Sequence, residues 1–232
     1  MNFTKLQEDL HNFELEIFTL NDIAKITGQD KNVLKTRLST LAKQKKIFRI
    51  KRGYYSLKKI QEKFKLQTVF KNSYVGLYSA LEYYGSTTQR FTNLDLITAN
   101  TLNQQIIHET TINFHKVKKN MFFGYKIIDD ITISSIEKTI IDCVYFSSKV
   151  YLTETLEFIR KNKKQINTAL LKDFLEKIDS SALNKRISYL LNKEGINIKN
   201  LKMNNKLEKL NVNKESKGEI DNKLKLIINE DF

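Results

Sequence analysis

The sequence contains no proline and no tryptophan, and it has only one cysteine and seven glycines among 232 residues. A single cysteine, Cys143, excludes an internal disulfide and is typical of a reducing compartment. No apolar run approaches the roughly 20 residues that a membrane-spanning helix needs. The amphipathic N-terminus also lacks the apolar core and cleavage site of a signal peptide. We therefore expect a cytoplasmic protein that has no membrane partner.

Acidic residues are scarce relative to basic ones, and the imbalance is local. The chain has 40 Lys and Arg against 26 Asp and Glu, which gives a net charge of +14. Residues 28–59 contain eleven Lys and Arg and a single acid, Asp30, so this stretch carries most of that charge. Such clustering is the electrostatic footprint of phosphate binding, and the alternative is a solvated basic face.

Helical patterns occupy the first part of this region. Apolar residues at helical spacing predict a first helix over residues 3–17. A short helix then begins with Thr19 or Asn21 as its cap and ends at Gly28, which is free to adopt the left-handed conformation. Gln29 or Asp30 caps the next helix, whose expected buried stripe comprises Val33, Leu34, Leu38, Leu41 and Ala42.

After residue 46 the apolar residues recur at every second position, which is the spacing of a β-strand. Ile47, Phe48 and Ile50 lead into Lys51-Arg52-Gly53, and residues 54–57 return, which predicts a basic hairpin. Helix, glycine turn, helix and hairpin together describe a winged helix-turn-helix domain over residues 1–59. We expect its partner to be double-stranded DNA. The candidate DNA-binding residues are Lys31, Asn32, Lys35, Thr36 and Ser39 in the second helix, and Lys45, Lys46, Arg49, Lys51, Arg52 and Tyr54 around the hairpin.

The rest of the chain predicts an α+β fold, with a small sheet followed by several helices. A connector at 60–72 leads to a second domain at 73–195. There we expect a helix over 74–85, strands over 95–99, 111–117, 121–128 and 131–133, a helix capped by Ser134 with Glu137 in a capping box, and helices over 150–163, 167–178 and 180–194. The Asn- and Lys-rich tail at 196–232 is expected to be partly disordered.

Patterns for catalysis or metal binding are incomplete. The three histidines, His11, His108 and His115, show no zinc-ligand spacing. Gly85-Ser86 followed by Asp95 is reminiscent of nucleotidyltransferases, but Ile97 stands where their second carboxylate is required for two-metal chemistry. We expect no enzyme activity, no metal and no cofactor.

A nuclease site would combine Asp95 with Glu109 and a lysine such as Lys116. The required Glu-x-Lys spacing is absent, because Thr111 stands two residues after Glu109. A nuclease that uses the winged module for targeting therefore stays a minor alternative.

Three segments resemble the AbiEi-type antitoxins of type IV toxin–antitoxin systems over about residues 1–195. They are Lys51-Arg52-Gly53-Tyr54-Tyr55, Ser79-Ala80-Leu81-Glu82-Tyr83-Tyr84-Gly85 and Ser135-Ile136-Glu137-Lys138-Thr139-Ile140-Ile141-Asp142. The resemblance implies a repressor that binds inverted repeats upstream of its own operon. It also implies a C-terminal domain that neutralises a cognate nucleotidyltransferase-like toxin, with direct binding of the toxin left open.

A second hypothesis needs no toxin. The chain would be a winged-helix regulator of other genes, and its C-terminal domain would sense a ligand or form dimers. Phe122, Phe123 and Tyr125 are candidates for lining a pocket, although such aromatic residues are more often part of a sheet core.

Overall fold

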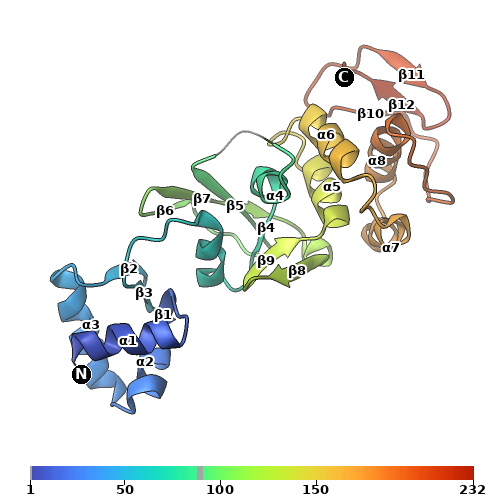
Figure 1. Ribbon diagram of the computed structural model, residues 1–232. Coiled ribbons are helices and arrows are strands. Elements are labelled where there is room, and N and C mark those ends of the chain that lie inside the picture. Colours follow the sequence, from blue (N-terminus) through green and yellow to red (C-terminus); the bar gives the residue numbers. More distant parts are fainter. Residues whose placement is uncertain (1, 88–90) are drawn as a thin grey trace.

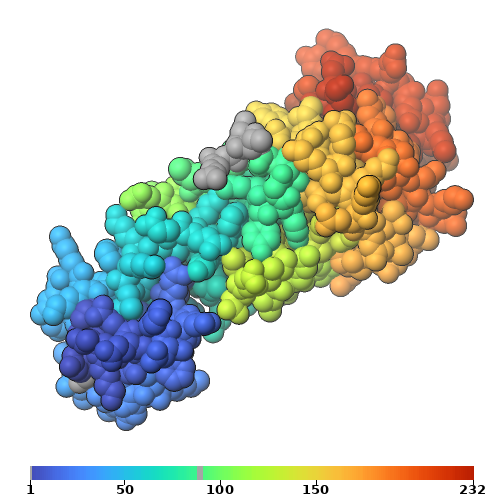
Figure 2. All heavy atoms as spheres, in the orientation of Figure 1, coloured from blue at the N-terminus to red at the C-terminus, as the bar shows by residue number. Residues whose placement is uncertain are grey.

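The computed structural model describes residues 2–87 and 91–232 and shows an elongated molecule (Figures 1 and 2). The N-terminal helices lie at one end, a mixed sheet occupies the middle, and further helices and a small sheet form the other end. The predicted α+β class is confirmed. Within the described residues, no helix is long and apolar enough to cross a bilayer.

The N-terminal unit consists of helices packed against a three-stranded sheet. Its elements are α1 (Phe3–Asn12), β1 (Ile17–Thr19), α2 (Leu20–Thr27), α3 (Lys31–Lys43), β2 (Phe48–Lys51) and β3 (Tyr54–Ser56). The sheet has the order β1-β3-β2, and both pairs are antiparallel. The core of this unit comprises Leu6, Leu10, Phe18, Ile23, Leu34, Leu38 and Ile47.

Local sequence signals account for the ends of α2 and α3. Thr19 caps α2 and forms a reciprocal capping box with Asp22. Gly28 ends α2 at φ +65°, a left-handed conformation that costs glycine little. The carboxylate of Asp30 then accepts hydrogen bonds from two backbone N–H groups of the first turn of α3.

Two expectations for this unit were wrong. The first helix ends at Asn12, and Ile17 lies in β1, where it pairs with Ser56 of β3. Val33 was expected to be buried but has 48% of its surface exposed, whereas Leu34 and Leu38 are fully buried. For Ile17 the pairing of β1 with β3 decides the outcome, which a helical period alone does not reveal.

A six-stranded mixed sheet forms the middle of the molecule, in the order β6-β7-β5-β4-β9-β8. Its elements and connections are η1 (Lys63–Val69), β4 (Tyr74–Val75), α4 (Leu77–Tyr83), β5 (Asn93–Thr98), β6 (Gln105–Ile107), β7 (Thr110–Lys116), η2 (Lys119–Met121), β8 (Tyr125–Ile128) and β9 (Ile131–Ser134). The β5–β7 and β4–β9 pairs are parallel, and the other pairs are antiparallel.

Successive residues of β5 point to opposite faces of the sheet and pack into different hydrophobic clusters. Leu96 belongs to the cluster that contains Leu66 of η1, while Ile97 belongs to the cluster that contains Leu77 and Leu81 of α4. This alternation is expected for a strand that is covered on both faces. It leaves Asp95 on the same face as Ile97.

Several boundaries in the sheet differ from the sequence prediction. The helix expected from residue 74 begins at Leu77, because Val75 pairs with Leu96 and Ile133 as part of the short central strand β4. The strand expected over 121–128 is confined to Tyr125–Ile128, since residues 119–121 form a 3-10 turn. The three-residue strand β6 was not anticipated.

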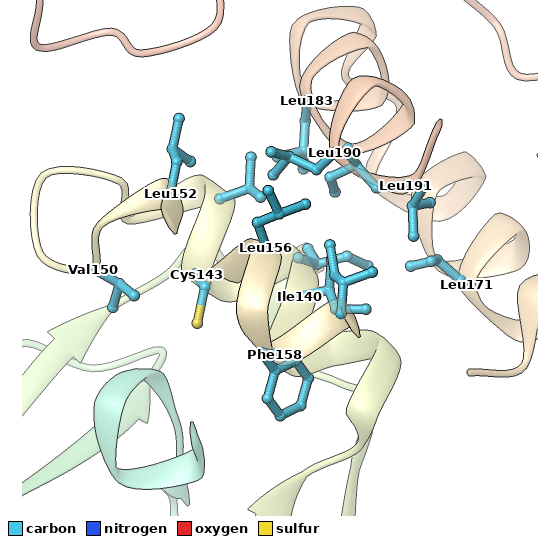
Figure 3. Close-up of a cluster of buried hydrophobic side chains, with 14 of the residues drawn as sticks. Ile140, Cys143, Val150, Leu152, Leu156, Phe158, Leu171, Leu183, Leu190 and Leu191 are labelled. Carbon is cyan, nitrogen blue, oxygen red and sulfur yellow. The ribbon is translucent and has the colours of Figure 1, made fainter. Parts of the chain in front are cut away.

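Four helices between the central sheet and the C-terminal end of the molecule contribute most of the large hydrophobic core (Figures 1 and 3). They are α5 (Ile136–Tyr145), α6 (Leu152–Asn162), α7 (Thr168–Ile178) and α8 (Ser181–Lys193). Fully buried leucines and isoleucines from all four helices meet there, and Cys143 lies among them.

The cap of α5 is a correction. Ser135, not Ser134, is the N-cap, and its hydroxyl accepts from the Lys138 N–H. Ser134 lies in β9 with its hydroxyl donating to the Val75 carbonyl. Glu137 forms no capping box, because its carboxylate instead accepts from the Asn167 N–H at the start of α7.

The C-terminal tail is ordered, contrary to the expected partial disorder. It contains β10 (Glu208–Lys209), β11 (Glu219–Asp221) and β12 (Leu226–Ile228), in the order β10-β12-β11. Leu210 and Leu226 are fully buried in the large core. The composition of the tail is polar, but its few leucines pack into the same hydrophobic core as α8.

Candidate nucleic-acid interface

The exposed side of α3 carries the residues that the sequence assigned to DNA contact. Lys31, Asn32, Lys35, Thr36 and Ser39 are all exposed. Their spacing places them along one side of the helix, next to the side that buries Leu34 and Leu38. The Thr36 hydroxyl donates to the Asn32 carbonyl at 3.3 Å, so this side chain is partly engaged by its own helix.

Basic residues continue from the end of α3 into the hairpin. Lys45, Lys46, Arg49 and Arg52 are exposed, and Arg52 precedes Gly53, which makes the turn at φ +86°. Within residues 2–87 and 91–232, no ion pair engages any of the cations of this group or of α3. We call the following residues the basic surface: Lys31, Asn32, Lys35, Thr36, Ser39, Lys45, Lys46, Arg49 and Arg52.

Lys51 and Tyr54 are next to the basic surface, since they line a hollow together with Arg52, but their side chains contact the rest of the molecule. The Lys51 ammonium is 4.4 Å from the ring centroid of Phe70, a cation–π contact with the connector. Tyr54 is half-buried and packs against the central cluster that contains Ile50. Both residues therefore attach the hairpin to the rest of the molecule, and nothing in the sequence pattern indicated this.

Further contacts hold the N-terminal unit against the central sheet. The Phe48 ring of β2 meets the His108 ring edge-on, with centroids 5.9 Å apart. The Ile60 N–H donates to His108 Nδ1 at 3.3 Å, and Lys65 forms an ion pair with Glu16. Burial, reinforced by the positive charge of Lys59, lowers the pKa of His108. His108 is therefore a neutral structural side chain.

The fold, but not the sequence, is similar to that of known proteins. No family model matches the sequence, and no curated protein matches it. The fold is similar to the crystal structure of the RV2827C protein from Mycobacterium tuberculosis. That superposition has a TM-score of 0.66 and covers 97% of this chain and 90% of the other, at 8% sequence identity. At this identity the similarity concerns the fold alone, and function has to be argued from the site.

The segment 135–142, which carries part of the family resemblance, has a structural role. Lys138 and Asp142 are fully buried and form an ion pair one helical turn apart. The Lys138 ammonium also donates to the Tyr74 hydroxyl at 3.0 Å, and this hydroxyl donates to Asp142 Oδ2 at 2.9 Å. The network joins α5 to β4, so these residues hold the domain together and do not face a ligand.

A polar hollow on the central sheet was missed by the sequence prediction. His115 Nε2 lies 2.9 Å from Asp95 Oδ1, and the Asn113 amide donates to the same oxygen at 3.2 Å. The paired strands β5 and β7 bring these three residues onto one face. Alternation along β7, where Asn113 and His115 alternate with the apolar Ile112 and Phe114, was the available signal. Among the described residues, no group of His, Cys, Asp and Glu is arranged to hold a metal ion.

Proposed function

We propose that the N-terminal unit is a winged helix-turn-helix that binds double-stranded DNA, and that the protein is an autorepressor and antitoxin of the AbiEi type. The observation that carries the DNA-binding part is the basic surface itself. Its cations project from α3, from the segment between α3 and β2, and from the β2–β3 hairpin, without acidic partners in the described chain. Lysine and arginine left unpaired on one face are available to phosphates.

The arrangement of α2 and α3 supports the assignment of α3 as the helix that contacts DNA bases. The two helices are joined by a short turn that contains Gly28, and α3 presents Lys31, Asn32 and Lys35 at its N-terminal half. In helix-turn-helix proteins this part of the second helix contacts base edges in the major groove. Asparagine pairs well with adenine, and lysine with guanine. Arg52 would then reach the phosphates or the minor groove beside the helix.

The direct test is binding to the DNA upstream of the gene, compared with random DNA of equal length, from about 50 to 200 mM salt. We expect tight binding that is selective for the upstream DNA. Asn32→Ala should reduce selectivity, while Lys45→Ala should weaken binding equally on both DNAs. Lys164→Ala, at an exposed lysine far from the basic surface, is the matched control. Equal binding to both DNAs would contradict the autorepressor.

The antitoxin part is supported by the three segments of sequence resemblance. Its test is rescue of growth when this protein is expressed with a nucleotidyltransferase-like toxin encoded beside it. A variant with Lys31, Lys35 and Arg52 changed to alanine should lose repression and keep rescue, because neutralisation is assigned to the C-terminal domain. Absence of rescue by the unaltered protein would refute this part.

One observation favours the second candidate, a regulator whose C-terminal domain senses a ligand. The hollow around Asp95 and His115 is open to solvent, and its lining contains several polar side chains. A change in DNA affinity on addition of a small molecule, with no toxin gene nearby, would support this candidate over the antitoxin.

A further inference from the structure

The hollow on the central sheet has the composition of a ligand site. It has a volume of about 490 Å³ and lies between the start of α4, strands β5 and β7 and the loop before α6. Its lining residues include Tyr78, Phe91, Asn93, Asp95, Asn113 and Lys149. Aromatic rings, a carboxylate, amides and one lysine thus converge on a single concave surface.

A row of hydrogen bonds fixes the floor of this hollow. The Gln104 amide donates to Asn113 Oδ1 at 2.7 Å, and the Asn113 amide donates to Asp95 Oδ1, which also accepts from His115. Both groups of the Asn113 amide are therefore used internally. Asp95 Oδ2, in contrast, has no partner within residues 2–87 and 91–232, although only 13% of this side chain is exposed. A preoriented carboxylate with one unused oxygen is an acceptor for an N–H donor of a ligand.

Aromatic rings form the wall. Tyr78 and Phe91 lie with their centroids 5.0 Å apart, and both line the hollow. The Tyr78 hydroxyl accepts from the Tyr151 N–H at 3.4 Å. Burial raises the pKa of Tyr78, so its hydroxyl keeps its proton and can donate. A flat ring that stacks on this wall would bring its edge to the row of polar side chains.

The rim supplies a positive charge. Lys149 is exposed, lines the hollow and forms no ion pair within the described part of the chain. An anionic group at one end of a ligand would reach this ammonium while the ring occupies the wall. The polar floor, the aromatic wall and the lysine at the rim would match the base edge, the base face and the phosphate of a nucleotide, respectively.

We propose that this hollow binds a guanine nucleotide, with Asp95 accepting from the base edge, Tyr78 and Phe91 contacting its face and Lys149 meeting its phosphate. Guanine presents two adjacent N–H donors on its Watson–Crick edge, and the free Oδ2 of Asp95 can accept from both. Adenine presents an unprotonated ring nitrogen there, which a carboxylate repels. The site lies outside the basic surface, so the proposal is independent of DNA binding.

The test is calorimetric titration of the full chain with GMP, guanosine, AMP and UMP. GMP should bind at least about tenfold more tightly than AMP or UMP, because one charge-assisted hydrogen bond accounts for that factor. Asp95→Asn should abolish the preference for GMP, since the amide oxygen stays with Asn113 and His115 and an NH2 donor replaces the free acceptor at the base edge. Lys149→Ala should weaken GMP to the level of guanosine and leave guanosine unchanged.

Two controls keep the result interpretable. Lys164→Ala removes another exposed lysine elsewhere and should leave GMP binding unchanged. If Asp95→Asn does not fold, the Lys149→Ala comparison of GMP with guanosine carries the test alone, because Lys149 is on the surface. Equal affinity for GMP and AMP, no binding at millimolar GMP, or unaltered binding in Lys149→Ala would each overturn the proposal.

Discussion

Lys138 and Asp142 pair with each other inside the protein, one turn apart in α5, and neither side chain has any exposed surface. The Tyr74 hydroxyl bonds to both, which closes a small network between the helix and β4. Burial raises the pKa of Asp142, and the neighbouring Lys138 opposes that effect. The pKa of Tyr74 is also raised well above its usual value by burial and by Asp142. A charge in this place is tolerated only while its partner is present.

Removal of one partner should therefore be costly. Asp142→Ala leaves the Lys138 ammonium buried and unpaired, and we expect a loss of about 3–5 kcal/mol in the free energy of unfolding. Urea denaturation measures it, and the double variant Lys138→Met/Asp142→Leu should recover much of the loss. Asp173→Ala, at an exposed aspartate of α7, is the matched control. A loss no larger than that control would show that the pair is not buried in solution.

Arg52 and Lys51 are adjacent in the hairpin but should affect DNA binding differently. Arg52→Ala should lower the slope of log affinity against log salt by about 0.9, the value for one phosphate contact. Lys51→Ala should lower it less, because its ammonium is already placed 4.4 Å from the Phe70 ring. Filter-binding titrations over a salt series measure both slopes. Equal effects of the two substitutions would mean that Lys51 leaves Phe70 to contact DNA.

His108 should make stability depend on pH in the acidic range. Its pKa is lowered in the folded protein, so below about pH 6.5 the unfolded chain binds a proton that the folded site resists. Stability is then complete above that pH and falls as the pH drops further. We expect His108→Gln to show a shallower decline of stability between pH 7 and 5, whereas His11→Gln, at an exposed histidine, should follow the unaltered protein. A decline identical in all three proteins would exclude His108 as its source.

The ordered tail yields a fourth prediction. Leu226→Ala should cost about 2–5 kcal/mol, because it empties a fully buried position in β12. Ile220→Ala in the neighbouring strand β11, where half of the side-chain surface is exposed, is the control and should cost much less. The midpoints of urea unfolding provide the comparison. If the tail were loosely ordered, the two variants would behave alike.

Local interactions were the predictable part of this fold. Thr19, Gly28 and the turn at Gly53 act within a few residues of the chain, so their effect is visible in the sequence. The consecutive serines 134 and 135 offered two caps of equal chemistry, and only the pairing of β9 selects the second. Strands of two or three residues, such as β4 and β6, are too short to show a period.

Long-range contacts account for what the sequence did not reveal. Asp95 and His115 are twenty residues apart, and only the parallel pairing of β5 with β7 brings them together. The same holds for Lys51 and Phe70, whose contact depends on how the hairpin meets the connector. The tail was misjudged because its average polarity conceals Leu210 and Leu226, which are buried individually.

The firm attachment of the hairpin to the central sheet has a consequence for an inverted repeat. Because Ile50, Tyr54 and Lys51 contact the central part of the molecule, α3 cannot swivel on a flexible tether. If two chains bound to facing half-sites also contact each other, they would then tolerate only certain rotational phases of the double helix. Insertion of half a helical turn, about five base pairs, would turn the second half-site to the opposite side of the DNA, and a full turn would restore its phase.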